Sequence, residues 1–216
     1  MPAYFELTHK YPVMLHVDAE SRILDRYPFG GLTGLLQPTV VRIPSTLNLV
    51  SGASTVGSTK TIAPAEKVDS EELLAFFRRS QALPLAKVFM SRSHDNGQTW
   101  TPAQAIGIPN GDASVVAWAD NDHIWLVANP EPYHRRSIAS FQLPLPLGEA
   151  SPILPTRILD EVTENAPGPK EFSYPSFATT TDGRLHLAYT ADGRSRIRHR
   201  VWSSLVPNPP VTSKQP

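Results

Sequence analysis

One stretch of the chain, the run SHDNGQTW at residues 93–100, limits the possible folds more than any other. Asp95 can accept hydrogen bonds from the backbone amides of the turn that follows it, and Gly97 can adopt the positive φ that such a turn requires. Trp100 can bury its ring beneath the turn. Residues 87–91 lead into the run as a strand. We therefore expect a tight turn between two strands of one hairpin.

A unit of strand, tight polar turn and strand recurs along the chain. Its copies span residues 13–26, 39–77, 113–128 and 176–190. Proline is abundant, with 22 residues, and long helical periodicity is absent. The best helix candidate, 71–79, contains the apolar run 73–77, which suits a buried strand equally well. Short apolar runs broken by Pro, Gly, Asp and Asn predict an all-β domain.

Two segments differ in composition from the rest of the chain. Residues 45–70 interrupt the second copy of the recurring unit; they are rich in Ser, Thr and Gly and lack apolar periodicity. We expect a mobile loop insertion there. Residues 206–216 are polar and proline-rich, which predicts a disordered tail. The recurring units all lie within residues 1–205, which we expect to form one structural segment.

The composition excludes several classes of function. The 20 basic and 20 acidic residues balance, so no global field attracts nucleic acid or a membrane surface. Without cysteine there is no disulfide and no thiolate metal site, and the seven histidines lack metal-ligand spacing, so we expect no metal and no other cofactor. The first residues lack a basic region followed by an apolar run. We expect a cytoplasmic protein if Met1 is the native start.

The pattern S-x-D-x-G-x-T-W resembles the Asp-box, the turn repeated in sialidase-type β-propellers. Its fixed positions are filled by Ser93, Asp95, Gly97, Thr99 and Trp100. Further segments resemble bacterial sialidase-like (BNR-repeat) proteins, namely 36–41, 108–110, 171–176, 182–190 and 196–199. Together they cover most of residues 4–202. The resemblance implies that the Asp-box is structural and lies on the face away from the active site.

The resemblance also divides the chain into blades. Residues 4–27 would supply about two strands, 35–108 a full blade, 113–160 another blade, and 174–202 about three strands. The total is roughly three blades, whereas a closed propeller needs at least about four. We therefore predict an all-β fold in which the chain forms a partial β-propeller, about three blades of a six-bladed sialidase-type propeller and its C-terminal portion.

The site residues of sialidases imply roles for several residues here. In sialidases three arginines clamp the substrate carboxylate, and a tyrosine with a glutamate partner is the nucleophile. A phenol avoids the repulsion that an anionic nucleophile would meet at a carbon bearing a carboxylate, and the arginine fork binds a carboxylate bidentately. Tyr174 matches the nucleophile. Arg78 matches the second clamp arginine, with Arg79 as its competitor, and Arg135 or Arg136 matches the third.

The chain also departs from the sialidase pattern. Gln37 stands where the activating glutamate is expected, and an amide cannot act as a base. Glu171, three residues before Tyr174, is the candidate substitute. The first clamp arginine and the acid/base aspartate belong to blades that precede this segment. A buried or rim aromatic is the alternative reading of Tyr174, and solvated charges are the alternative for the arginines and Glu171.

Two functions follow from these residues. The first is a sialidase-like exo-glycosidase segment that acts on glycans and is incomplete or inactive alone; its partners would be a glycan and either the missing N-terminal blades or a second copy. The second is a non-catalytic carbohydrate-binding or scaffolding propeller remnant. In both, the substrate-binding candidates converge on one rim opposite Asp95, and these are Gln37, Arg78, Asn110, Arg135 or Arg136, and Tyr174. The alternating arginines 194–200 suit a solvated or partner-facing strand better than a nucleic-acid stripe.

Overall fold

The computed structural model describes residues 2–5, 11–30, 34–43, 72–80, 85–120, 123–143, 152–162 and 171–203 of the 216-residue chain. Within these ranges every regular element is a β-strand, and every strand pairing is antiparallel. The all-β fold is confirmed. The expected mobile loop at 45–70 and the tail at 206–216 lie outside the described residues. Since the described part has no helix at all, it has none that could cross a membrane.

The described strands form four sheets, and each sheet follows the order of the chain. The first sheet contains β1 (Pro2–Phe5), β2 (Tyr11–Val17) and β3 (Ile23–Pro28). The second contains β4 (Leu35–Arg42), β5 (Leu73–Arg79), β6 (Lys87–Ser93) and β7 (Gln104–Pro109). The third contains β8 (Val116–Ala119), β9 (Ile124–Ala128), β10 (Ser137–Leu143) and β11 (Arg157–Glu161). The fourth contains β12 (Ser173–Thr179), β13 (Leu185–Ala191) and β14 (Arg196–Trp202).

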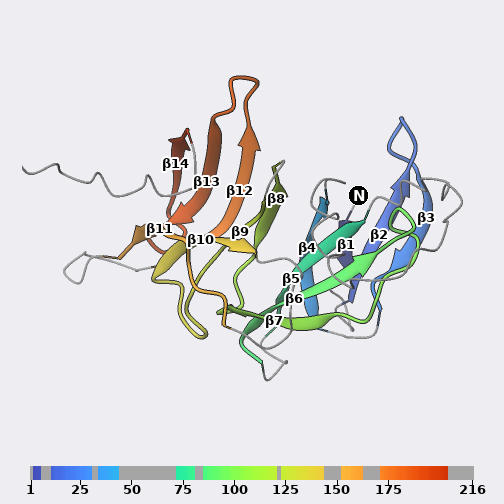
Figure 1. Cartoon of the computed structure of the whole chain (residues 1–216), viewed down its shortest axis with the longest axis horizontal. Helices are drawn as coiled ribbons and strands as arrows, with labels where there is room; N and C mark the ends of the chain where they lie inside the picture. Colours follow the sequence, from blue (N-terminus) through green and yellow to red (C-terminus); the bar gives the residue numbers. More distant parts are fainter. Residues whose placement is uncertain are drawn as a thin grey trace, which may run out of the picture.

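The sheets are arranged as successive blades of a partial propeller (Figure 1). The first strands of consecutive sheets lie against one another, β1 against β4, β4 against β8, and β8 against β12. The two middle blades have four strands, and the two end blades have three among the described residues. The first blade has three strands, one more than the two expected. The sequence does not predict the additional strand, β1, because its four residues begin with proline and are too few to show a hydrophobic period.

Strand β5 resolves the helix-or-strand ambiguity of the second blade. It pairs with β4 on one side and β6 on the other, so it is an internal strand. Leu74 and Phe76 point into the core shared with the third blade. Leu73, Ala75 and Phe77 point into the core that contains Phe29 and Trp100. Successive side chains therefore enter two different cores, which explains why the run is apolar without alternation.

The turn after β6 has the hydrogen bonds expected from its sequence. The Asp95 carboxylate accepts hydrogen bonds from the Gln98 and Thr99 amides at 3.1 and 2.8 Å, and Ser93 Oγ donates to it at 2.8 Å. Gly97 has a φ of 87°. The indole Nε1 of Trp100 donates to the Gly97 carbonyl at 2.9 Å, and the Trp100 ring is 8% exposed. The turn is thus tied to the core beneath it.

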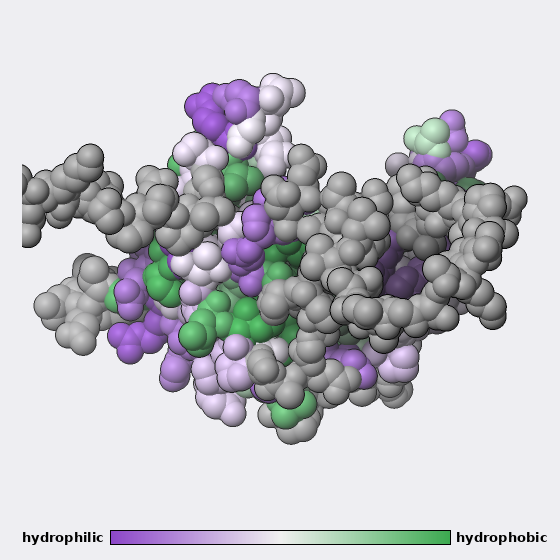
Figure 2. Space-filling model, viewed as in Figure 1, coloured by the Kyte–Doolittle hydropathy of each residue, from purple (hydrophilic) through white to green (hydrophobic). Residues whose placement is uncertain are grey.

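Apolar side chains remain exposed on the outer strands of the two end blades. Ile23 and Leu24 of β3 are 48% and 54% exposed, and Ile197 and Val201 of β14 are 68% and 43% exposed. Figure 2 shows further apolar surface over the region of β8 to β10. The alternating arginines behave differently. Arg198 and Arg200 of β14 form ion pairs with Asp160 of β11 at 2.6 and 3.3 Å, so this face of β14 turns toward the third blade.

The Asp95 turn makes stability sensitive to acid. Hydrogen bonds from the Thr99 side chain and amide lower the pKa of Asp95 to about 2, whereas an aspartate in the unfolded chain has a pKa of about 3.9. A lowered folded pKa contributes stability that is present above the unfolded pKa and lost as the pH falls toward 2. We expect the denaturant midpoint of Asp95→Asn to depend less on pH between 2 and 5 than that of the wild type. Equal slopes for the two proteins would contradict this.

Candidate functional site

Strand register places the sialidase-like residues and the Asp-box turn at opposite ends of the second blade. Leu36 of β4 pairs with Arg78 of β5, so Gln37 and Arg78 lie at the same end. Leu73, at the other end of β5, pairs with Ser93, where the Asp95 turn begins. The end that holds Gln37 and Arg78 is called the rim below.

Three residues with positive φ occupy equivalent places in three successive blades. Gln37, Asp112 and Tyr174 have φ values of 47°, 61° and 53°. Each begins a similar run at the first strand of its blade: QPTVV lies within β4, DASVV leads into β8, and YPSFA lies within β12. In β4 and β12 the pairing register shifts at this place, as at a β-bulge.

This backbone conformation is costly. Residues other than glycine rarely adopt positive φ, and a following proline further restricts the residue before it. Such strain persists where the surrounding structure enforces it, and it occurs often at functional sites. The repeated positive φ therefore marks the rim of all three blades as a candidate site.

Arg78 connects two of these three residues. Its Nε donates to Gln37 Oε1 at 2.8 Å, and its Nη1 donates to Asp112 Oδ1 at 2.5 Å. The side chain of Arg78 is only 12% exposed. Arg79, the competing candidate, is also buried but donates to the Ser80 carbonyl. Because successive side chains of a strand point to opposite faces, Arg78 reaches Gln37 and Asp112 at the rim, and Arg79 points to the other face of β5.

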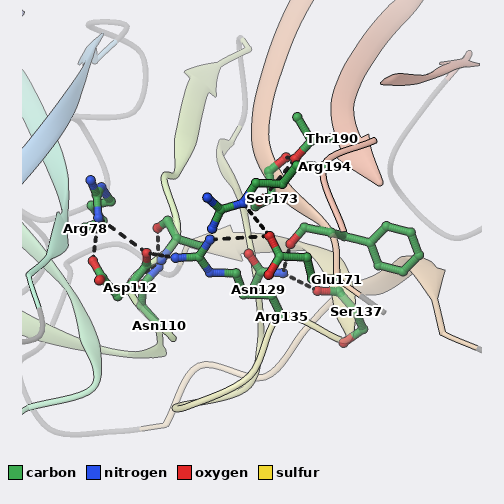
Figure 3. Close-up of polar contacts among 12 residues, drawn as sticks. Arg78, Asn110, Asp112, Asn129, Arg135, Ser137, Glu171, Ser173, Thr190 and Arg194 are labelled. Atoms are coloured by element: carbon green, nitrogen blue, oxygen red, sulfur yellow. Dashed lines mark hydrogen bonds and ion pairs between the residues drawn. The ribbon is translucent and has the colours of Figure 1, made fainter. Parts of the chain in front are cut away.

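Arg135 extends the network toward the fourth blade, and Figure 3 shows it between Asp112 and Glu171. Its Nη2 donates to the Asp112 carbonyl at 2.5 Å, and its Nη1 lies 3.8 Å from Glu171 Oε1. The guanidinium carbon is 5.9 Å from the centre of the Tyr174 ring. Arg136 is exposed to solvent instead. Of the two alternatives, the structure brings Arg135 to the rim.

Arg194 completes the cluster around Tyr174. Its guanidinium carbon lies 5.4 Å from the Tyr174 ring centre, and its Nε donates to Glu171 Oε1 at 2.6 Å. The hydrogen bond to Glu171 raises the pKa of Arg194. Glu171 is thus held by two arginines. Among the described residues, none forms a hydrogen bond with the Tyr174 hydroxyl, so the position of Glu171 as a partner base for Tyr174 stays a prediction.

Asn110 shapes the loop that presents Asp112. Its side chain is fully buried; Nδ2 donates to the Ala113 carbonyl at 2.8 Å, and Oδ1 accepts from the Ala113 amide at 3.3 Å. Gly111 lies so close to the neighbouring loop that a Cβ there would come within 2.7 Å of the His134 carbonyl oxygen. Both polar groups of Asn110 are therefore used inside the loop, and the backbone of the loop is closely packed.

A second buried amide joins the third and fourth blades beneath the rim. Asn129 Nδ2 donates to the Ser137 and Phe172 carbonyls at 2.6 and 2.9 Å. The Phe172 amide in turn donates to the Arg135 carbonyl at 2.7 Å. These bonds fix the loop carrying Arg135 against the segment carrying Glu171. The relative positions of the two charged groups therefore depend on the backbone as well as on their own contact.

The cluster carries a small positive charge. The guanidinium groups of Arg78, Arg135 and Arg194 outnumber the carboxylates of Asp112 and Glu171 by one. Nη1 of Arg135 is buried and has no hydrogen-bond partner in the described part of the chain. No group of three or more His, Cys, Asp or Glu side chains among the described residues could hold a metal ion. The rim thus offers hydrogen-bond donors and one aromatic ring.

Two of these residues were not identified as site residues from the sequence. Aligning the run DASVV with QPTVV and YPSFA would identify Asp112, because it stands at the first position of its run, as Gln37 and Tyr174 do in theirs. The sequence alone places Arg194 in an alternating run of arginines. It lies instead in the turn between β13 and β14, with a φ of 70°, and so leaves the alternation of the strand.

Comparison with known proteins identifies the family. The model of the BNR repeat-like domain matches residues 1–187, so the chain belongs to the BNR repeat-like family. The sequence resemblance to BNR-repeat proteins is confirmed. None of the curated proteins matches.

Among solved structures, the chain is similar to one titled Bacteroides ovatus Xyloglucan PUL GH43B, with 11% identity and a TM-score of 0.49. The alignment covers 97% of this chain and 41% of that one, so the chain spans less than half the length of this similar structure. A likeness of this degree carries no information about function.

The loop that presents Asp112 should be sensitive to loss of the Asn110 amide. Asn110→Ala would leave the Ala113 amide and carbonyl without partners in a buried place, which costs about 1–3 kcal/mol of the free energy of unfolding. We expect a loss of that size in urea denaturation. Gln98→Ala, at an exposed position, is the control and should change stability by less than about 0.5 kcal/mol. Equal stability of the two variants would show that Asn110 does not hold the loop.

Proposed function

We propose that the chain is the ligand-binding part of a sialidase-like exo-glycosidase propeller, which turns over a glycan only when further blades complete the site. One observation carries the proposal: the Tyr174 ring lies beside the guanidinium groups of Arg135 and Arg194, on a rim that also holds the Arg78–Asp112 pair. Sugars offer hydroxyl groups to polar side chains and C–H faces to aromatic rings. The rim supplies both kinds of contact.

The residues support part of a glycosidase mechanism. Tyr174 would attack the anomeric carbon as the bond to the leaving group breaks and the sugar takes on positive, oxocarbenium-like charge. The nearby guanidinium groups would stabilise negative charge on the phenol oxygen of the nucleophile, whose proton must pass to a base. The backbone of Tyr174 has positive φ at the bulge of β12, so the backbone conformation fixes the direction in which the Tyr174 side chain leaves the strand.

Among the residues that the structure describes, none is placed for the other steps of the mechanism. The amide of Gln37 accepts a hydrogen bond from Arg78 and cannot take a proton from Tyr174. Glu171 is engaged by Arg194 and lies near Arg135. A proton donor for the leaving group, worth about 10²–10⁴-fold in rate, would come from blades beyond this segment. The isolated chain is therefore expected to bind glycans weakly and not to hydrolyse them.

The second candidate is a non-catalytic carbohydrate-binding propeller. The use of Gln37 and Glu171 in structural contacts favours it, because neither is poised as a base. In either case the three-stranded end blades and the exposed apolar residues of β3 and β14 support packing of further blades or of a second copy.

The proposal is tested with purified chain on a glycan array and with a panel of fluorogenic aryl glycosides that includes a sialoside. We expect glycan binding that Tyr174→Ala weakens by about tenfold or more, which corresponds to about 1.4 kcal/mol. Tyr133→Ala is the matched control, since Tyr133 is 71% exposed, and it should bind as the wild type does. No turnover is expected from the isolated chain.

Two results would contradict the proposal. Failure to bind any glycan would remove the ligand-binding role. Robust turnover that disappears in Tyr174→Phe would show that the chain assembles a complete site by itself or as an oligomer, and the incompleteness would then be wrong.

A further inference from the structure

We infer that Asp112 determines the specificity of the rim, because its carboxylate already occupies the place at Arg78 where the carboxylate of an acidic sugar would bind. The rim would therefore accept a neutral, hydroxyl-bearing part of a glycan next to Arg78. This inference rests on the proposed function, since it concerns which glycans the rim accepts.

The hydrogen-bonding edges of Arg78 are partly occupied by the chain itself. A guanidinium binds a carboxylate bidentately through a pair of nitrogens, either Nε with one Nη or the two Nη atoms. Nε of Arg78 donates to Gln37, and Nη1 donates to Asp112. Each edge thus has one nitrogen already engaged. A ligand carboxylate could bind bidentately only by displacing Gln37 or Asp112.

The pair is also protected from water. The side chains of Arg78 and Asp112 are 12% and 16% exposed, so solvent and salt screen their attraction less than at an open surface. A second carboxylate brought to Arg78 would be close to Asp112 and would be repelled by it. The local charge of the pair is zero, which removes the attraction that a free arginine would exert on an anion.

The backbone sets the position of Asp112. Its φ is 61°, and it lies at the place that Gln37 and Tyr174 occupy in their own blades. Asn110 bonds the loop from inside, and Arg78 and Arg135 both donate to the Asp112 carbonyl, at 3.4 and 2.5 Å. The carboxylate is therefore a fixed part of the rim, unlike a surface side chain that could swing aside for a ligand.

A neutral ligand fits this arrangement better than an anionic one. Oδ2 of Asp112 has no hydrogen bond with the described residues, so it can accept a hydrogen bond from a sugar hydroxyl. The remaining positive charge of the cluster lies at Arg135 and Arg194, on the other side of Asp112, and is partly balanced by Glu171.

The test uses acetate as a carboxylate probe and follows the Arg78 Nε–H signal by NMR of protein with ¹⁵N-labelled arginine. Asp112→Asn removes the charge and keeps the shape, because asparagine tolerates positive φ and its Oδ1 can still accept from Arg78. Asp182→Asn is the matched control. It makes the same charge change in the turn after β12, at the end of the blade opposite Tyr174, where Asp182 pairs with Arg184.

We expect no saturable response of the wild-type Arg78 signal to acetate. In Asp112→Asn the apparent affinity should rise by about tenfold or more, and in Asp182→Asn it should match the wild type. Saturable binding of acetate at Arg78 in the wild type would overturn the inference, as would an equal gain of affinity in both variants.

The wild-type titration decides the first of these outcomes even if a variant folds poorly. None of these outcomes affects the glycan-array result for Tyr174→Ala, so failure of this inference can be distinguished from failure of the proposed function.

Discussion

The ion pair between Arg78 and Asp112 is the contact on which the rest of the rim depends. Arg78 comes from β5 of the second blade, and Asp112 from the loop that opens the third. The Asp112 carbonyl then accepts a hydrogen bond from Arg135, whose other nitrogen faces Glu171 at the start of the fourth blade. One chain of polar contacts thus crosses three blades at the end where the strained residues lie.

The apolar cores between blades make this chain of contacts possible. One core joins the second and third blades through residues such as Phe76 and Phe141, and another joins the third and fourth through Trp125 and Tyr189. Burial of such side chains is the main source of stability, while a largely buried ion pair contributes less and constrains geometry more. The cores set the blades side by side, and the polar contacts set the position of the rim residues relative to one another.

The sequence was sufficient for the architecture and for much of the rim. The residue types at 93–100 predicted the turn at Asp95. The recurring units of strand, turn and strand predicted the pairs β2–β3, β8–β9 and β12–β13. Arg78 and Tyr174 were placed by resemblance to a known family. Alternation along β5 separates Arg78 from Arg79 only once its two faces are known, because both faces of that strand are apolar.

Other features could not be predicted because they depend on backbone geometry and on contacts between blades. The choice of Arg135 over Arg136 depends on a loop tied to Phe172 in the next blade, a contact between residues far apart in sequence. The role of Asp112 depends on positive φ at a residue whose run lacks the proline of its two counterparts. β1 was missed because four residues carry too little pattern.

A double-mutant cycle between Arg78 and Asp112 tests the central claim most directly. The free energies of unfolding of the wild type, Arg78→Met, Asp112→Gly and the double variant give the coupling between the two side chains, since glycine removes the carboxylate and tolerates the positive φ of this position. The account predicts a coupling of about 1–3 kcal/mol, as expected for a hydrogen-bonded charged pair that is mostly shielded from water. A coupling near zero would show that the pair does not join the two blades and would contradict the account.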